Sequence, residues 1–320
     1  MNWKQTLFWS FSAAAIFYYF LLFGVFVFVG QEEMQLFIPE WWYIREFLFQ
    51  PGGFCAVAGQ WIIQYYRQPM SAVVLHTVLL VGCGFMVYRI LRCFSDKTYL
   101  LFLSLLPVLY LVKMSIHGEY LVDGTVGVVL MLLALSVSLK VRRAGSIAGY
   151  GIASTLFLCG LTGLLSVCYA FLYTLLALLR YKTSRQRLAA AACLIPALFI
   201  YLFSGWLGIP VPLSDGWMPE AYLEIQRLPH YYMYRVWTFF TLSIVGVALF
   251  ARFVPVIGEK SKWMDRVALV VCLITALVSI RFCLPEPWHA QRMMLDELSF
   301  LARERQWDAI IDKYRGNETV

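Results

Sequence analysis

Long apolar runs separated by short polar segments dominate the pattern of this chain. The first run covers residues 7–30, and similar runs recur as far as residue 282. A bilayer crossing needs about 20 largely apolar residues, so each run predicts a membrane-spanning helix. The predicted spans lie near residues 7–30, 71–91, 98–116, 125–139, 147–160, 163–179, 188–207, 236–250 and 267–282. We therefore expect an all-α, polytopic integral membrane protein with about nine transmembrane helices.

Residues 147–179 form one apolar stretch that is too long for one ordinary helix and short for two. Basic residues flank it on both sides, between residues 140 and 143 and between residues 180 and 187. Cytoplasmic loops are enriched in lysine and arginine, so both flanks are expected in the cytoplasm. Two short helices that turn near residues 159–163 satisfy this condition, and so does a re-entrant hairpin.

Composition and charge give the orientation. Hydrophobic residues make up 61% of the chain and charged residues 14%, whereas a soluble domain has roughly 45–50% and about 25%. These values exclude a water-soluble enzyme and a disordered chain. With the N-terminus inside and the C-terminus outside, the inner segments carry a charge of +12 and the outer segments −5, which gives the net +7. The positive charge is therefore a topology signal, and no nucleic-acid partner is expected.

Two long outer loops are expected. In residues 31–70, aromatic and charged residues alternate, which predicts amphipathic helices lying in the membrane interface. The segment Pro51-Gly52-Gly53 breaks this loop into two helices. Residues 208–234 form the second loop and open with two prolines.

The composition changes at the C-terminal end. Residues 1–284 form the predicted transmembrane domain, and residues 285–320 read as an outer helical hairpin rich in charged side chains. This hairpin resembles half of a tetratricopeptide-type unit, of which about three copies are needed to bury a continuous face. We expect the hairpin to dock on the membrane domain or on a periplasmic partner, unless the chain is shorter than its relatives.

A family resemblance rests on the first outer loop. The chain carries Phe49-Gln50-Pro51-Gly52-Gly53-Phe54, then Gln60-Trp61-Ile62-Ile63-Gln64-Tyr65-Tyr66 and Pro69. These segments resemble a bacterial family of multi-span membrane proteins of unknown function, which combines a glycine-pair loop with a helical-repeat tail. The resemblance implies a place in the bacterial inner (cytoplasmic) membrane, and it implies relatives with a longer soluble tail. It supplies no catalytic residues.

Ionisable residues near membrane depth are costly, and they indicate function by default. One cluster joins the third and fourth predicted spans: Lys113, His117, Glu119 and Asp123. Glu32 and Glu33 follow the first span on the same predicted side. All four histidines fall on the predicted outer half, so chemistry is expected there. His76 reads as a buried, hydrogen-bonded histidine.

These acids show a weaker likeness to multi-span, GT-C-type glycosyltransferases that use lipid-linked sugar donors. The likeness implies that a carboxylate deprotonates the acceptor or positions a divalent metal beside the phosphate of a polyprenyl-phosphate-type lipid. The candidate catalytic acids are Glu32, Glu33, Glu119 and Asp123. The candidate phosphate-binding residues are Lys113, Arg45 and Arg235. Acyl transfer is a further alternative, with His117 as the base and Glu119 or Asp123 orienting it.

The eight cysteines have no metal-binding spacing, and no Walker A, Rossmann, HExxH or CxxC motif occurs. We therefore predict no metal site and no resident cofactor, apart from the divalent metal of the transferase hypothesis. A disulfide between Cys55 and Cys283 is an open question at this level.

Two hypotheses remain. The first is a non-enzymatic membrane component whose outer loops and tail, residues 285–320, recruit or scaffold a periplasmic partner. The second is an outward-facing transferase that acts on a lipid-linked substrate.

Overall fold

All the regular secondary structure in the described part of the chain is helical. A computed structural model describes residues 3–34, 37–97, 99–117, 120–203, 228–258, 270, 284 and 287–314. Within these residues the helices are α1 (Trp3–Phe23), α2 (Val25–Met34), α3 (Trp41–Leu48), α4 (Gly53–Ile63), the 3-10 turn η1 (Gln64–Arg67), α5 (Pro69–Leu91), α6 (Leu100–Ser115), α7 (Val122–Ser138), α8 (Ala144–Thr162), α9 (Leu165–Arg180), α10 (Ser184–Ala191), α11 (Leu194–Leu202), α12 (Leu228–Gly258), α14 (Pro287–Arg303) and α15 (Trp307–Tyr314).

The molecule is a membrane protein by the length and surface of its helices. Among the residues that the structure describes, five helices are long and apolar enough to cross a bilayer: Trp3–Phe23, Pro69–Leu91, Ala144–Thr162, Ser184–Leu202 and Val236–Phe253. Large apolar side chains cover the outside, with Phe11 74% and Ile195 72% exposed. A water-soluble surface rarely presents such patches, whereas lipid tails solvate them. The count of nine spans and the orientation stay predictions, and the predicted last span, residues 267–282, is described only at residue 270.

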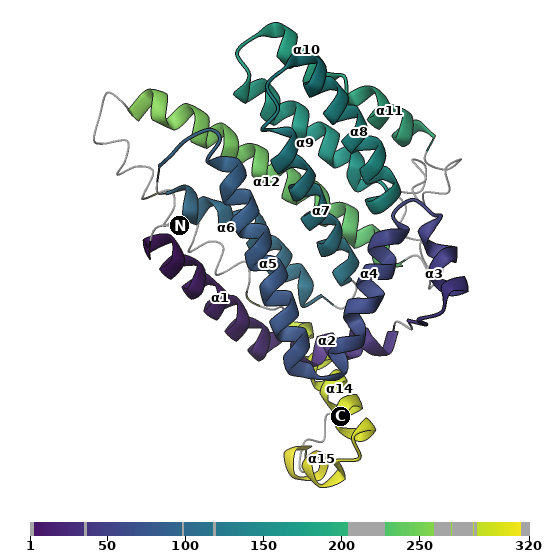
Figure 1. The fold of residues 1–320 in the computed structure, drawn as a ribbon. Coiled ribbons are helices and arrows are strands. Elements are labelled where there is room, and N and C mark those ends of the chain that lie inside the picture. Colours follow the sequence, from purple (N-terminus) through teal and green to yellow (C-terminus); the bar gives the residue numbers. More distant parts are fainter. Residues whose placement is uncertain are drawn as a thin grey trace.

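The helices form two groups with two helices between them (Figure 1). In the first group, α5 packs against α1, α2 and α6. In the second, α8 packs against α9 and α10. The intervening α7 contacts α5 and α9, while α12 contacts α6 and α9. The buried core therefore runs continuously from one group to the other.

The apolar stretch 147–179 divides into two helices in the structure. α8 and α9 pack against each other, and the break comes at Gly163, which has a φ of 62°. Glycine takes a positive φ of this kind without steric cost. Gly52, with a φ of 84°, lies against this turn, and its N–H donates to the carbonyl of Gly160 at 3.0 Å. The loop between α3 and α4 thus docks on the turn between α8 and α9.

The two helices of the first outer loop differ in their surroundings. The sequence predicts that both lie in the membrane interface, and α3 buries no residue. One face of α4, however, packs against α7 and α8, and it buries Gly53, Cys55 and Gly59. Small residues on this face let the backbones of α4 and α7 approach closely. Trp61 and Tyr65 remain exposed on the other side.

Basic loops meet at one end of the bundle. The Tyr181 hydroxyl donates to the carbonyl of Val141 at 2.6 Å, and the Gln186 amide donates to the carbonyl of Arg142 at 2.6 Å. These contacts join the α7–α8 loop to the α9–α10 loop. We call this the basic end of the bundle, which the charge pattern predicts to be cytoplasmic.

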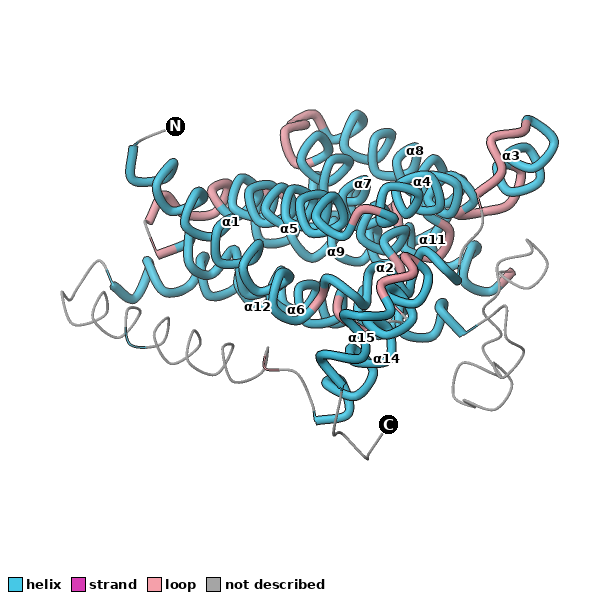
Figure 2. The backbone as a smooth tube through the Cα atoms, turned by 90° about the horizontal axis from the view of Figure 1, so that it is seen from below, coloured by secondary structure: helices cyan, strands magenta, loops and turns pink. Residues whose placement is uncertain are grey.

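The C-terminal hairpin, α14 and α15, lies below the N-terminal end of α5 in Figure 1, next to α2. Figure 2 shows this hairpin and α3 at separate edges of the molecule. The second predicted outer loop falls largely outside the described residues, which omit residues 204–227.

Candidate functional site

Asp123 lies in the first turn of α7, at the point where α4 packs against this helix. Its Oδ1 accepts a hydrogen bond from the backbone N–H of Gly124 at 2.8 Å, and the positive end of a helix dipole favours a carboxylate there. Gly59 of α4 lies against it so closely that a Cβ on this glycine would be 2.6 Å from the Cβ of Asp123. The side chain is partly buried as a result.

Burial, together with the charge of this carboxyl, raises the pKa of three other side chains. Burial raises the pKa of Tyr66 well above its usual value, and the negative charge of Asp123 raises it further. The same two causes, burial first, raise the pKa of Cys55 to about 12. Burial is also the main reason why the pKa of Tyr120 is raised, and Asp123 contributes. We call Asp123, Tyr66, Tyr120 and Cys55 the Asp123 cluster. Its thiol stays protonated near neutral pH and is therefore a poor nucleophile.

A buried histidine lies behind Tyr66. The hydroxyl of Tyr66 and Nε2 of His76 are 2.6 Å apart, and both side chains are fully buried. Phe28 stacks on the imidazole ring with centroids 4.1 Å apart and planes at 9°. Within the described residues Nδ1 of His76 has no hydrogen-bond partner. His76 is thus the buried, hydrogen-bonded histidine that the sequence predicts.

Tyr120 links α2 to the start of α7, and its neighbour Gly124 bonds to α12. Its carbonyl accepts a hydrogen bond from the side-chain amide of Gln31 on α2 at 3.1 Å. Its hydroxyl accepts one from Thr125 on α7 at 3.3 Å. The indole N–H of Trp237 on α12 donates to the carbonyl of Gly124 at 3.3 Å. The first turn of α7 is therefore held from α2, α4 and α12 together.

The candidate site residues predicted from the sequence lie in different parts of the structure. Glu32 pairs with Arg303 of the C-terminal hairpin at 2.9 Å. Arg45 is exposed on α3, with its guanidinium 5.7 Å from the Phe49 ring centroid. Lys113 and His117 are partly buried around the end of α6.

The other predicted residues fall outside the described part. Glu119 is not among the described residues, and neither are the side chains of Glu33 and Arg235. Cys283, which enters the disulfide question, also lies outside them, while Cys55 is a buried free thiol.

Sequence reasoning missed Tyr66 and Gln31 as partners of the Asp123 region. Both lie in residues 31–70, which the sequence predicts to be an outer loop with helices in the membrane interface. The available signal was the glycine at position 59, because a glycine inside an apolar helical run indicates close backbone approach. Nothing in the spacing indicated that α7 was the helix approached.

A family model matches residues 1–319 of the chain. The chain belongs to the DUF6057 family. This family is described as one of unknown function, as the sequence resemblance implied. Comparison with curated proteins finds no match to the chain, and comparison with solved structures finds none either.

The described part of this DUF6057 protein contains no group of three or more histidine, cysteine, aspartate or glutamate side chains that could hold a metal ion. The Asp123 cluster offers a single carboxyl within electrostatic range of two phenols, whose hydroxyls bond to His76 and to Thr125. A carboxyl of this kind can hold a proton.

Proposed function

We propose that this DUF6057 protein is a membrane-anchored platform that recruits a protein partner through its C-terminal hairpin. One observation carries the proposal: α14 is fixed to the bundle, while α15 presents exposed apolar side chains. Trp307 is 57% exposed and Ile311 51% exposed. In a hairpin that only covers the bundle, these residues would face inward.

Three contacts anchor α14 on the N-terminal helices. The imidazole of the buried His289 lies 2.9 Å from the carbonyl oxygen of Phe23. The rings of Phe26 and Phe300 have centroids 6.0 Å apart. The Arg303–Glu32 pair closes the far end of the helix. Lys313 pairs with Glu297 and so holds α15 to α14. The hairpin is therefore positioned before any partner arrives, which lowers the entropy cost of binding.

The exposed face of α15 has a defined chemistry. Trp307 and Ile311 are one helical turn apart, and Asp308 and Asp312 form a parallel row beside them. All four residues are exposed, and we call them the α15 stripe. A complementary partner has an apolar pocket bordered by lysine or arginine. An anionic membrane surface fits less well, because its headgroups repel the two carboxylates.

The orientation that the charges predict places this stripe outside the inner membrane, in the periplasm of a bacterium. The partner is accordingly a periplasmic protein. The tetratricopeptide-like reading of residues 285–320 belongs to this proposal, since such repeats commonly serve as binding surfaces.

The test uses the full-length protein with a photo-crosslinking residue in place of Trp307. The matched control carries the same residue in place of Phe157, an exposed aromatic on α8 that faces the predicted lipid. We expect position 307 to crosslink to one protein and position 157 to crosslink to lipid. The crosslink at 307 should disappear when Asp308 and Asp312 are both changed to lysine. A lysine variant that crosslinks equally well, or lipid adducts at 307, would overturn the proposal.

A second candidate is the GT-C-like transferase, and the partly buried Asp123 beside Tyr66 is the observation that favours it. The Arg303–Glu32 pair counts against a catalytic role for Glu32, because the carboxylate is already engaged. In membrane vesicles supplied with a lipid-linked sugar, Asp123→Asn should abolish transfer and Asp308→Asn should not. Equal transfer by both variants would remove this candidate.

A further inference from the structure

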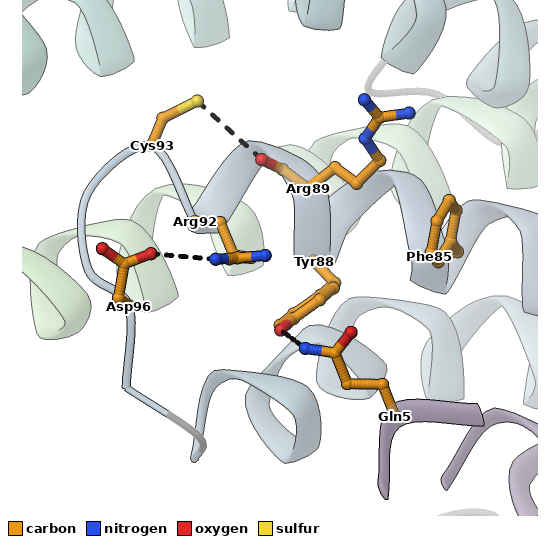
Figure 3. A pocket seen from close by; sticks show the side chains of 7 residues that line it. All are labelled: Gln5, Phe85, Tyr88, Arg89, Arg92, Cys93 and Asp96. Atoms are coloured by element: carbon orange, nitrogen blue, oxygen red, sulfur yellow. Dashed lines mark hydrogen bonds and ion pairs between the residues drawn. The ribbon is translucent and has the colours of Figure 1, made fainter. Parts of the chain in front are cut away.

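A pocket opens at the basic end of the bundle, far in the fold from the C-terminal hairpin. It lies between the first turn of α1 and the last turn of α5 (Figure 3), and its volume is about 390 Å³. Gln5, Tyr88, Arg89, Arg92 and Asp96 are among the side chains that line it. None of them enters the function proposed above.

Side-chain contacts between α1 and α5 form the floor of the pocket. The side-chain amide of Gln5 donates to the hydroxyl of Tyr88 at 2.9 Å, which joins α1 to α5. Trp9 packs edge-on against Phe85 and Tyr88, with ring centroids 5.9 and 6.3 Å apart. Tyr88 is therefore only 7% exposed, and its hydroxyl is bonded to Gln5 at the floor of the pocket.

The rim carries an excess of positive charge. Arg92 pairs with Asp96 at 3.2 Å, and both side chains are well exposed. Exposed pairs of this kind are weak and rearrange easily. Arg89 has no carboxylate within ion-pair distance among the described residues, and its guanidinium stands 6.0 Å from the Phe85 ring centroid. Two arginines and one aspartate leave the rim with a net charge of +1, which a phosphate diester would neutralise.

The surroundings of the pocket are apolar. Val74 and Val78 of α5 are exposed on the same helix face as Phe85 and Arg89, which line the pocket. A headgroup seated between Arg89 and Arg92 would leave its acyl chains on this surface. A free phosphate would gain nothing from it.

We propose that this pocket binds the phosphate of an anionic membrane lipid. Guanidinium groups recognise phosphate through paired, charge-assisted hydrogen bonds. Basic pockets between transmembrane helices on the cytoplasmic side are suited to anionic headgroups. The lipid bridges α1 and α5 at the point where Gln5 and Tyr88 already join them.

The test uses the full-length protein in vesicles of phosphatidylcholine, with or without phosphatidylglycerol. Cys93 lines the pocket and is exposed, so its alkylation, followed by peptide mass spectrometry, reports occupancy. Phosphatidylglycerol should slow this alkylation. The double variant Arg89→Gln/Arg92→Gln should weaken the protection about tenfold or more, which corresponds to the loss of one or two charge-assisted hydrogen bonds.

The matched control is Arg142→Gln/Arg143→Gln, because these exposed arginines stand at the same end outside the pocket. This control removes the same amount of positive charge. The protection of Cys93 by phosphatidylglycerol should stay within about twofold of that in the unsubstituted protein. The double variant Arg89→Lys/Arg92→Lys keeps the positive charge and the fold. Its protection of Cys93 should lie between that of the unsubstituted protein and that of the Arg89→Gln/Arg92→Gln variant, since lysine cannot form the paired hydrogen bonds of arginine.

Three results would overturn the proposal. The first is equal alkylation of Cys93 with and without phosphatidylglycerol. The second is equal loss of protection in the two glutamine variants, which would indicate general attraction by the basic end. The third is full protection by inorganic phosphate in phosphatidylcholine vesicles, which would assign the pocket to a soluble anion.

Discussion

Replacing Gly59 with alanine tests the contact that shapes the Asp123 cluster. The added methyl carbon would lie 2.6 Å from the Cβ of Asp123, 2.9 Å from its Cα and 3.0 Å from its nitrogen. These are backbone-level contacts, so α4 and α7 must separate by about 1 Å to restore van der Waals distances. Overpacking of this kind costs about 1–3 kcal/mol. The higher helix propensity of alanine compared with glycine offsets up to about 1 kcal/mol of this overpacking cost.

The control is Gly82→Ala on α5, where an added Cβ meets nothing within 4 Å. It gains the same propensity without the clash, so the difference between the two variants isolates the contact. At about 2 °C per kcal/mol for a chain of this size, Gly59→Ala should melt roughly 2–6 °C below Gly82→Ala. Thermal unfolding in one detergent, followed by circular dichroism, measures both. If Gly59→Ala melted at or above Gly82→Ala, α4 would not press on α7 as the structure shows.

Three further outcomes are expected. Gly52→Ala forces alanine to a φ of 84° and should cost about 1–2 kcal/mol of unfolding free energy; Gly160→Ala, with open space around its Cβ, should not, and equal stability of the two variants would contradict this. His76→Phe strands the buried hydroxyl of Tyr66 at a cost of about 1–3 kcal/mol. Tyr66→Phe in the same chain should recover part of that loss in denaturant unfolding, whereas additive losses would mean that the two side chains do not bond. Burial, aided by the charge of Asp123, raises the pKa of Tyr66 well above 10.0, so the folded state keeps a proton that the unfolded state loses. Stability should therefore fall as pH rises above about 10, by up to about 1.4 kcal/mol per pH unit for this group, and a Tyr66→Phe variant with an unchanged slope would refute the assignment.

Hydropathy alone located most of the described helices, because each apolar run is long enough to satisfy its own backbone hydrogen bonds within lipid. It placed a turn near residues 159–163, but it left open whether residues 147–179 cross the membrane twice or form a re-entrant hairpin, since both alternatives satisfy the same charge rule. The break at Gly163 depends on a glycine with positive φ and on the docking of Gly52 against this turn. That contact joins segments more than a hundred residues apart, and no local pattern records it.

The candidate site was predictable only in part. Asp123 stood out because a carboxyl next to an apolar run is costly. Its association with Tyr66 was not predictable, since the tyrosine stands among several similar aromatic residues between positions 41 and 66. Glu32 also stood out as an acid after the first span, yet its partner Arg303 is 271 residues away along the chain.

Membrane character, helix positions and the predicted orientation all follow from properties that each residue carries along the chain, namely apolar surface and charge. The bilayer acts on these properties segment by segment, so they can be read in order. The burial of α4, the place of the C-terminal hairpin and the partners of Asp123 follow from which helix faces meet. In lipid that choice depends on close packing between small residues and on a few polar contacts, and both exist only once the helices are side by side.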